Sequence, residues 1–172
     1  MLLRYSLKLK CCWTSCRHPR VLYAYGIACE YLLCELMGGS LEDARYWNAP
    51  LPAPLVVTTM SEILEGLAHL HRLSVVHRDI KPENIMVANS AKAPFGCKLG
   101  DFGLAVRLTG ALTQRVGTAG FTAPEMLLNT GYATGVDVWA CGLTGFWLLY
   151  GRLPWDAKLK LVDEIQRKPI GP

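Results

Sequence analysis

The stretch His77-Arg78-Asp79-Ile80-Lys81-Pro82-Glu83-Asn84, here called the octad, decides how the rest of this 172-residue chain is interpreted. Seven of its eight residues are polar, charged or proline, yet a helix-like apolar segment precedes it and an apolar tripeptide follows it. Polar side chains are costly to bury without partners, so we expect a loop between two buried elements. Its side chains are therefore expected to be held at a site.

The composition indicates one globular domain. Hydrophobic residues make up 51% of the chain, and 172 residues are enough for one domain with a core. The net charge of +4 comes from scattered basic residues, which argues against nucleic-acid binding. The longest apolar stretch, residues 136–150, falls short of the roughly 20 residues that span a bilayer, so we expect a buried core helix and no membrane span.

The seven cysteines form no regular disulfide framework. Arg4, Lys8 and Lys10 interrupt the apolar start of the chain, so no signal peptide is expected. We therefore interpret the cysteines as reduced thiols of an intracellular, cytoplasmic protein.

Before the octad, the pattern predicts two strands and two helices. Residues 21–29 and 31–37 are rich in Tyr, Val, Ile and Leu and indicate strands. Ser40, with Asp43 three positions later, indicates the start of a helix after a pair of glycines. A loop with three prolines follows, and apolar residues spaced three or four apart predict an amphipathic helix over 55–73.

After the octad, short strands are expected at 85–87 and 97–99. Asp101-Phe102-Gly103 follows at once, and a loop-like stretch leads to Ala123-Pro124-Glu125. A helix is expected over 135–150, ended by Gly151 in a left-handed cap, and a last amphipathic pattern covers 159–165.

Three motifs therefore occur in one order: the octad, Asp101-Phe102-Gly103, and Ala123-Pro124-Glu125. Each alone is weak, because a single Asp is usually a solvated or capping carboxylate and Asp-Phe-Gly is a common turn. Together, over residues 18–167, they resemble the eukaryotic protein kinase family, whose catalytic loop reads H-R-D-x-x-x-x-N. The Lys-Pro-Glu-Asn end of the octad and Gly117-Thr118 are similar to the Ser/Thr branch.

The resemblance implies a site for ATP, Mg²⁺ and a protein substrate. Asp79 would accept the proton of the substrate hydroxyl, and Lys81 would neutralise charge on the transferring phosphoryl group. Asn84 and Asp101 would ligate magnesium through hard oxygen atoms. Thr118 would contact both Asp79 and Lys81.

For the nucleotide, the resemblance implies a hinge after a gatekeeper at Cys34. Backbone groups of Glu35 and Met37 would bind adenine, and Met86 would pack beneath it. Ordinary core packing is the alternative explanation for Cys34 and Met86.

The resemblance also implies a regulatory role for Arg78. In the family this arginine couples activity to a phosphate on the activation segment, which is the stretch from Asp101-Phe102-Gly103 to Ala123-Pro124-Glu125. Thr113 is the first candidate acceptor and Thr109 the second.

Structural roles are implied for five further residues. Asp137 would begin the central buried helix and brace the catalytic loop. Glu125 would pair with an arginine located beyond residue 172. His77, Phe102 and Gly103 would hold the two site loops.

The expected fold is α+β and protein-kinase-like, with few remaining N-lobe strands and a mostly helical C-lobe. Residues 1–17 stay unassigned, 18–39 would supply N-lobe strands and the hinge, and 40–172 the C-lobe. No Gly-rich loop and no Val-Ala-Ile-Lys-like strand occurs in residues 1–17, so we expect a domain truncated at both ends.

Three functions remain open. The chain is a fragment of a Ser/Thr kinase that transfers the ATP γ-phosphate to a protein hydroxyl, or a pseudokinase-like binding or regulatory module with a partner kinase. The third alternative, a structural or interaction protein, leaves the linked motifs unexplained.

Overall fold

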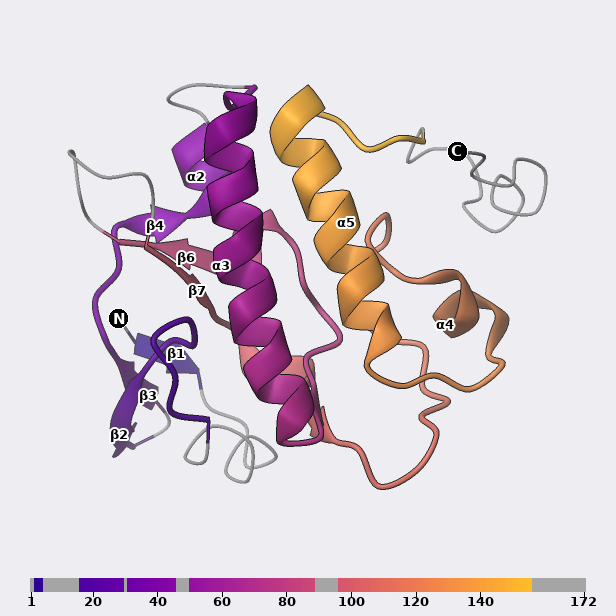
Figure 1. The fold of residues 1–172 in the computed structure, drawn as a ribbon. Coiled ribbons are helices and arrows are strands. Elements are labelled where there is room, and N and C mark those ends of the chain that lie inside the picture. Colours follow the sequence, from indigo (N-terminus) through magenta and orange to yellow (C-terminus); the bar gives the residue numbers. More distant parts are fainter. Residues whose placement is uncertain (1, 5–15, 30, 46–49, 89–95, 156–172) are drawn as a thin grey trace.

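The computed structural model describes residues 2–4, 16–29, 31–45, 50–88 and 96–155 (Figure 1). Its strands are β1 (Leu2–Arg4), β2 (Ala24–Ala28), β3 (Tyr31–Cys34), β4 (Gly39–Ser40), β5 (Val75–Val76), β6 (Ile85–Val87), β7 (Cys97–Leu99) and β8 (Val106–Arg107). Its helices are α2 (Leu41–Arg45), α3 (Ala53–Arg72), α4 (Pro124–Leu128) and α5 (Gly135–Tyr150), with 3₁₀ turns at Pro82–Asn84 and Phe102–Leu104. This is the expected α+β, kinase-like arrangement.

The first sheet has the order β1-β3-β2 and is antiparallel throughout. The predicted strands 21–29 and 31–37 are observed as the shorter β2 and β3, because Val21 and Leu22 pair with Leu99 of β7 and not with β3. The β2–β3 ladder itself is irregular between Ala24 and Gly26. Strand β1 was not predicted, because residues 1–17 show no clean period.

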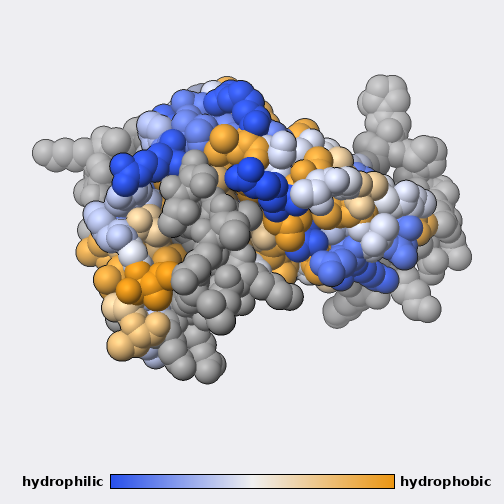
Figure 2. Space-filling view, turned by 90° about the horizontal axis from the view of Figure 1, so that it is seen from below, coloured by the Kyte–Doolittle hydropathy of each residue, from blue (hydrophilic) through white to orange (hydrophobic). Residues whose placement is uncertain are grey.

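One face of the β2–β3 pair is solvent-exposed. The alternation in β3 places Leu32 and Cys34 in the core and leaves Tyr31 and Leu33 exposed. Figure 2 shows hydrophobic side chains reaching the surface among hydrophilic ones.

Helices α3 and α5 lie side by side and form the centre of the larger part of the molecule (Figure 1). Helix α3 begins at Ala53, two residues before the predicted start, so Pro54 lies in its first turn and not in the loop. Helix α5 has the predicted bounds, and Gly151 caps it with φ 71° while its N–H donates to the Trp147 carbonyl at 2.8 Å. The core between these helices includes Ile63, Leu67 and Leu148.

A second sheet, with the order β4-β6-β7, lies beside α3. The sequence indicated only the start of a helix after the glycine pair, but Gly39 and Ser40 themselves pair with β6. Ser40 also caps α2: its N–H donates to the Asp43 carboxylate at 2.8 Å, and the Asp43 N–H donates to Ser40 Oγ at 3.2 Å.

The third sheet pairs β5, which directly precedes the octad, with β8. Within the described residues, no helix is long and apolar enough to cross a membrane. The amphipathic pattern expected over 159–165 lies outside the described part of the chain.

Candidate active site

The octad connects β5 to β6, and its first residue, His77, is completely buried. His77 Nδ1 accepts from the Asp79 N–H at 3.3 Å, and Nε2 lies 2.8 Å from the Gly100 carbonyl. The neutral tautomer with its proton on Nε2 satisfies both contacts. The ring also packs against Phe102, with 4.9 Å between centroids. His77 therefore joins the octad to the segment that carries Asp101.

Asp137, in the first turn of α5, fixes the backbone of the octad. Its carboxylate is completely buried and accepts from the N–H groups of His77 at 2.9 Å and Arg78 at 2.8 Å. His71 Nε2 lies 2.8 Å from the same carboxylate. Arg78 adopts φ 69°, a left-handed conformation that is unfavourable for a residue with a side chain. The contacts of Asp137 hold that conformation, as the sequence interpretation expected of a bracing residue.

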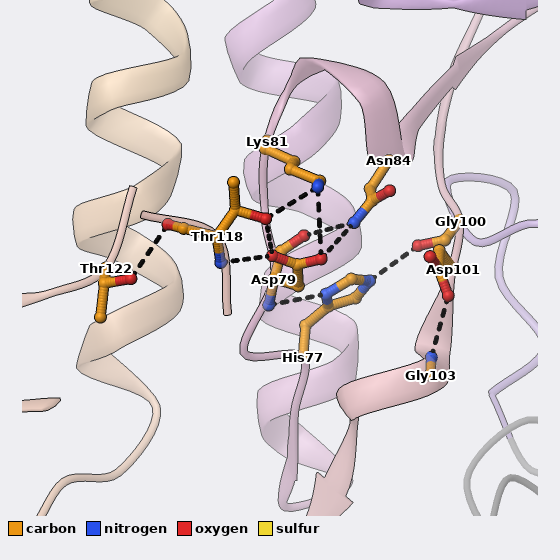
Figure 3. A network of polar contacts seen from close by, with 9 residues as sticks. All are labelled: His77, Asp79, Lys81, Asn84, Gly100, Asp101, Gly103, Thr118 and Thr122. Atoms are coloured by element: carbon orange, nitrogen blue, oxygen red, sulfur yellow. Dashed lines mark hydrogen bonds and ion pairs between the residues drawn. The ribbon is translucent and has the colours of Figure 1, made fainter. Parts of the chain in front are cut away.

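Asp79 is the centre of a polar network shown in Figure 3. Thr118 donates to Asp79 Oδ1 from its N–H at 3.0 Å and from its hydroxyl at 2.8 Å. Asn84 Nδ2 donates to Asp79 Oδ2 and to the Asp79 carbonyl, each at 2.8 Å. Lys81 Nζ donates to Thr118 Oγ1 at 2.7 Å and lies 3.7 Å from Asp79 Oδ2. The structure thus brings together the four residues predicted for this part of the site.

Gly117 allows Thr118 to approach the octad. It has φ 95°, and a Cβ atom added there would lie 2.7 Å from the Arg78 carbonyl oxygen. Only glycine fits both conditions without a shift of the backbone. The glycine therefore determines how closely the Thr118 hydroxyl meets Asp79.

Asp101 follows β7 and lies close in the fold to Asn84, because the Gly100 N–H donates to the Asn84 carbonyl at 2.8 Å. Asp101 has φ 46°, is exposed, and accepts from the Gly103 N–H at 3.1 Å. Phe102, beside it, is fully buried. An exposed carboxylate next to a turn can still take a ligand, whereas the buried phenyl ring serves as the anchor.

The side-chain oxygen atoms of Asn84 and Asp101 are of the kind that binds a magnesium ion. Amide and carboxylate oxygens are the hard ligands that Mg²⁺ prefers, and Mg²⁺ sites generally take few protein ligands and complete their shell with water and phosphate. Because Asn84 turns its NH₂ group toward Asp79, its Oδ1 atom is left to face a ligand (Figure 3). Among the described residues, no group of three or more His, Cys, Asp or Glu residues could hold a metal.

Arg78 reaches the activation segment with its side chain. Its Nε donates to the Leu104 carbonyl at 2.7 Å, and NH1 donates to Gln114 Oε1 at 3.3 Å and to the Tyr132 hydroxyl at 3.2 Å. Tyr132 in turn donates to the Gln114 carbonyl at 2.6 Å. Sequence reasoning missed Gln114 and Tyr132, since neither belongs to a motif.

The candidate phosphate acceptors Thr109 and Thr113 are both exposed. Thr113 immediately precedes Gln114, whose side chain contacts Arg78. Glu125 is half-buried in the first turn of α4.

The residues predicted for the nucleotide lie at the end of β3 and on β6. Cys34 is buried, and burial raises the pKa of its thiol, with a further increase from neighbouring Glu35. Glu35, Met37 and Met86 are half-buried. The carboxylate of Glu35 is bound by Lys98 Nζ at 2.7 Å to each oxygen, a contact that no motif indicated.

Comparison with known proteins agrees with this geometry. A family model described as "Protein kinase domain" matches residues 12–169. The mouse "Serine/threonine-protein kinase DCLK3" is 34% identical over 156 residues, which cover 88% of this chain and 20% of that protein. The human "Serine/threonine-protein kinase DCLK2" is 38% identical over 136 residues, covering 78% of this chain and 18% of that protein. The rat "Serine/threonine-protein kinase DCLK1" is 39% identical over 140 residues, covering 78% and 32%.

The chain spans about a fifth of the length of the first two of these relatives. The family match nevertheless covers most of this chain and includes the octad, the Asp-Phe-Gly turn and helix α5. This chain belongs to the protein kinase family.

Proposed function

We propose that this chain carries the catalytic residues of a Ser/Thr protein kinase, which transfers the γ-phosphate of ATP to a serine or threonine hydroxyl of a protein. The observation that supports the proposal best is the network around Asp79. A carboxylate held by Thr118 and Asn84, with the Lys81 ammonium beside it, is suited to orient a hydroxyl.

Asp79 would act as the base for the substrate hydroxyl. Its side chain is 13% exposed, so it borders solvent while three hydrogen bonds from Thr118 and Asn84 fix the orientation of its carboxylate. A fourth hydrogen bond, from Asn84, binds its backbone carbonyl. Positioning of this kind is the main demand that phosphoryl transfer makes on the protein.

Lys81 would place a positive charge beside the phosphoryl group during transfer. Its contact with Thr118 Oγ1 at 2.7 Å keeps the ammonium close to Asp79 without forming a tight ion pair, since 3.7 Å separates Nζ from Oδ2. The ammonium can therefore turn toward a phosphate while the carboxylate stays in place.

Asn84 and Asp101 would hold Mg²⁺, which when bound neutralises charge on the phosphate oxygens. Both residues are held by backbone contacts, through the 3₁₀ turn Pro82–Asn84 and through the Gly103 N–H. Glu35, Met37 and Met86 would form the adenine site.

The experiment compares Asp79→Asn with Asp43→Asn. Both carboxylates accept hydrogen bonds from a backbone N–H and from a hydroxyl, but Asp43 caps α2 and lies outside the site. Loss of a general base lowers the rate of phosphate transfer to a Ser/Thr peptide library by about 10²–10⁴-fold, and the control variant should transfer at the unmodified rate. Equal transfer by the two variants would contradict the assignment of Asp79.

Binding of a fluorescent ATP analogue without any transfer would instead favour the alternative, a pseudokinase-like binding or regulatory module. In that case the test is capture of a partner kinase by the full chain.

We further propose that residues 18–39 form the end of the smaller lobe with the hinge and that 40–172 belong to the larger lobe. The β1-β3-β2 sheet shares no strand with the β4-β6-β7 sheet, and this supports the division. An intracellular, cytoplasmic location is proposed from the seven cysteines without a disulfide framework.

Thr113 is proposed as the regulatory phosphate acceptor, with Thr109 as the second candidate. Its exposure and its place beside Gln114, which contacts Arg78, support the choice. Phosphate incorporation that is unchanged in Thr113→Ala would dismiss it.

A further inference from the structure

Glu35, at the point where β3 ends, binds two other segments of the chain. Its backbone N–H donates to the Tyr23 carbonyl at 3.0 Å, and its Oε1 accepts from the Tyr23 N–H at 2.7 Å. Its two carboxylate oxygens each lie 2.7 Å from Lys98 Nζ on β7. The carboxylate therefore connects the end of β3, the segment around Tyr23 and β7.

Lys98 lies on the face of the β6–β7 sheet that carries Met86. The two residues are directly opposite in the antiparallel register, so their side chains share one face. This pair is half-buried, whereas the flanking pairs, Ile85 with Leu99 and Val87 with Cys97, are buried on the other face. Lys98 is also three residues before Asp101, the proposed metal ligand.

Residues 35–38 are thus attached to this sheet at both ends. At the first end Glu35 binds Lys98, and at the other end the Gly38 N–H donates to the Val87 carbonyl at 2.8 Å. The two attachment points are neighbouring register pairs of the sheet. Two contacts therefore attach segment 35–38 to this sheet, and of these only the ion pair uses side chains on both partners.

From this geometry we propose that Lys98 and Glu35 are positioning residues, which clamp segment 35–38 against the sheet that carries Met86 and so keep the proposed adenine site in its binding geometry. The inference rests on the proposed ATP-dependent function and adds to it the residues that determine nucleotide affinity from outside the nucleotide site. Glu35 acts here through its carboxylate, in addition to any backbone contact that it makes.

The pair is expected to act locally. The Lys98 and Glu35 side chains are 24% and 21% exposed, so water reaches both charges and can solvate the Glu35 carboxylate when the ammonium is removed. Removal of the ammonium should therefore loosen segment 35–38 without unfolding the protein. The protected N–H groups of Glu35 and Gly38 can report this loosening in hydrogen exchange.

The experiment compares Lys98→Met with Lys98→Arg and with a control, Arg20→Met. Arg20 NH1 forms an equally short ion pair, 2.8 Å to Glu62, and it lies beside β7 but contacts α3 and not the hinge. We expect Lys98→Met to speed exchange at the Glu35 and Gly38 amides by about tenfold and to raise the Kd of a fluorescent ATP analogue by about three- to tenfold. Lys98→Arg should keep both the exchange rate and the Kd close to those of the unmodified protein, because a guanidinium also pairs with a carboxylate.

Two readouts separate this clamp from the proposed function. Unchanged exchange at residues 35–38 in Lys98→Met overturns the clamp whether or not the chain binds nucleotide. Faster exchange with unaltered analogue affinity overturns the positioning role. An unmodified chain that does not bind the analogue refutes the ATP-dependent function, and the clamp is then decided by exchange alone. If Lys98→Met does not fold, Glu35→Gln, which keeps an acceptor for the Tyr23 amide, gives the same comparison.

Discussion

Replacement of Asp137 by Asn tests whether one buried carboxylate holds the octad. The substitution keeps the shape of the side chain but replaces one acceptor oxygen by an NH₂ group. If the remaining oxygen keeps its bond to the Arg78 N–H, the new NH₂ group faces the His77 N–H, and two donors oppose each other. The His77 N–H then loses its partner in a site with no access to water.

The expected loss follows from these contacts. An unpaired buried N–H costs about 1–3 kcal/mol, and the bond to Arg78 loses about 1 kcal/mol because its acceptor is no longer charged. The free energy of unfolding should therefore fall by roughly 2–4 kcal/mol, which lowers Tm by roughly 5–15 °C for a chain of this size. Relaxation of the left-handed Arg78 backbone would offset part of this loss.

Urea unfolding followed by tryptophan fluorescence measures the effect, since the chain has five tryptophans. We expect a lower midpoint with an unchanged m-value. Thr144→Val is the matched control on α5: Thr144 is also fully buried, but its hydroxyl bonds only to the Ala140 carbonyl of the same helix at 2.9 Å. An Asp137→Asn variant that unfolds within about 1 kcal/mol of the unmodified protein would refute the bracing role, because a lost buried partner costs at least that much.

Three shorter predictions concern other parts of the fold. Burial raises the pKa of the Cys97 thiol to about 12, so about one thiol in 10,000 is ionised near pH 8. Iodoacetamide should therefore label the exposed Cys29 but leave Cys97 unlabelled until urea is added, and peptide mass spectrometry measures both. Gly117→Ala should lower the free energy of unfolding by roughly 1–3 kcal/mol in the same urea assay, because the new Cβ meets an octad carbonyl at a positive φ. Hydrogen bonds from the α2 cap lower the pKa of Asp43. Its contribution to stability is therefore complete above the unfolded pKa of about 3.9 and is lost as pH falls through the folded pKa. Asp43→Asn should lack this acid dependence when urea unfolding is measured at a series of pH values.

Helices α3 and α5 were predictable because each depends on local sequence, whereas α4 was not predicted. The three- to four-residue spacing of apolar positions located α3, and an apolar run closed by Gly151 located α5 with its observed bounds. The start of α3 was placed two residues late, because prolines were read as loop residues although the first turn of a helix accepts them.

The strands were less predictable because their ends depend on tertiary contacts. The run 21–29 was expected as one strand, but Val21 and Leu22 pair with Leu99 of β7 and only the later residues join β3. A single apolar run thus serves two sheets. Apolar pattern alone does not distinguish these partners.

The motif residues of the site could be identified from spacing, but their supporting contacts could not. Arg78 meets Gln114 and Tyr132 across 36 and 54 residues, and Lys98 meets Glu35 across 63 residues. Each of these partners belongs to a common residue type with no distinctive neighbours in the sequence. Only the fold selects which polar side chain meets which.

The supporting contacts connect the proposed base, Asp79, to the proposed metal ligand Asp101. Asp137 fixes the backbone of His77, the His77 ring binds the carbonyl of Gly100, and Gly100 is followed directly by Asp101. Asp79 lies on the other side of His77 and donates its N–H to the same ring. Because one imidazole lies between the proposed base and the proposed metal ligand, a change at the start of α5 should disturb both together, although α5 itself supplies neither.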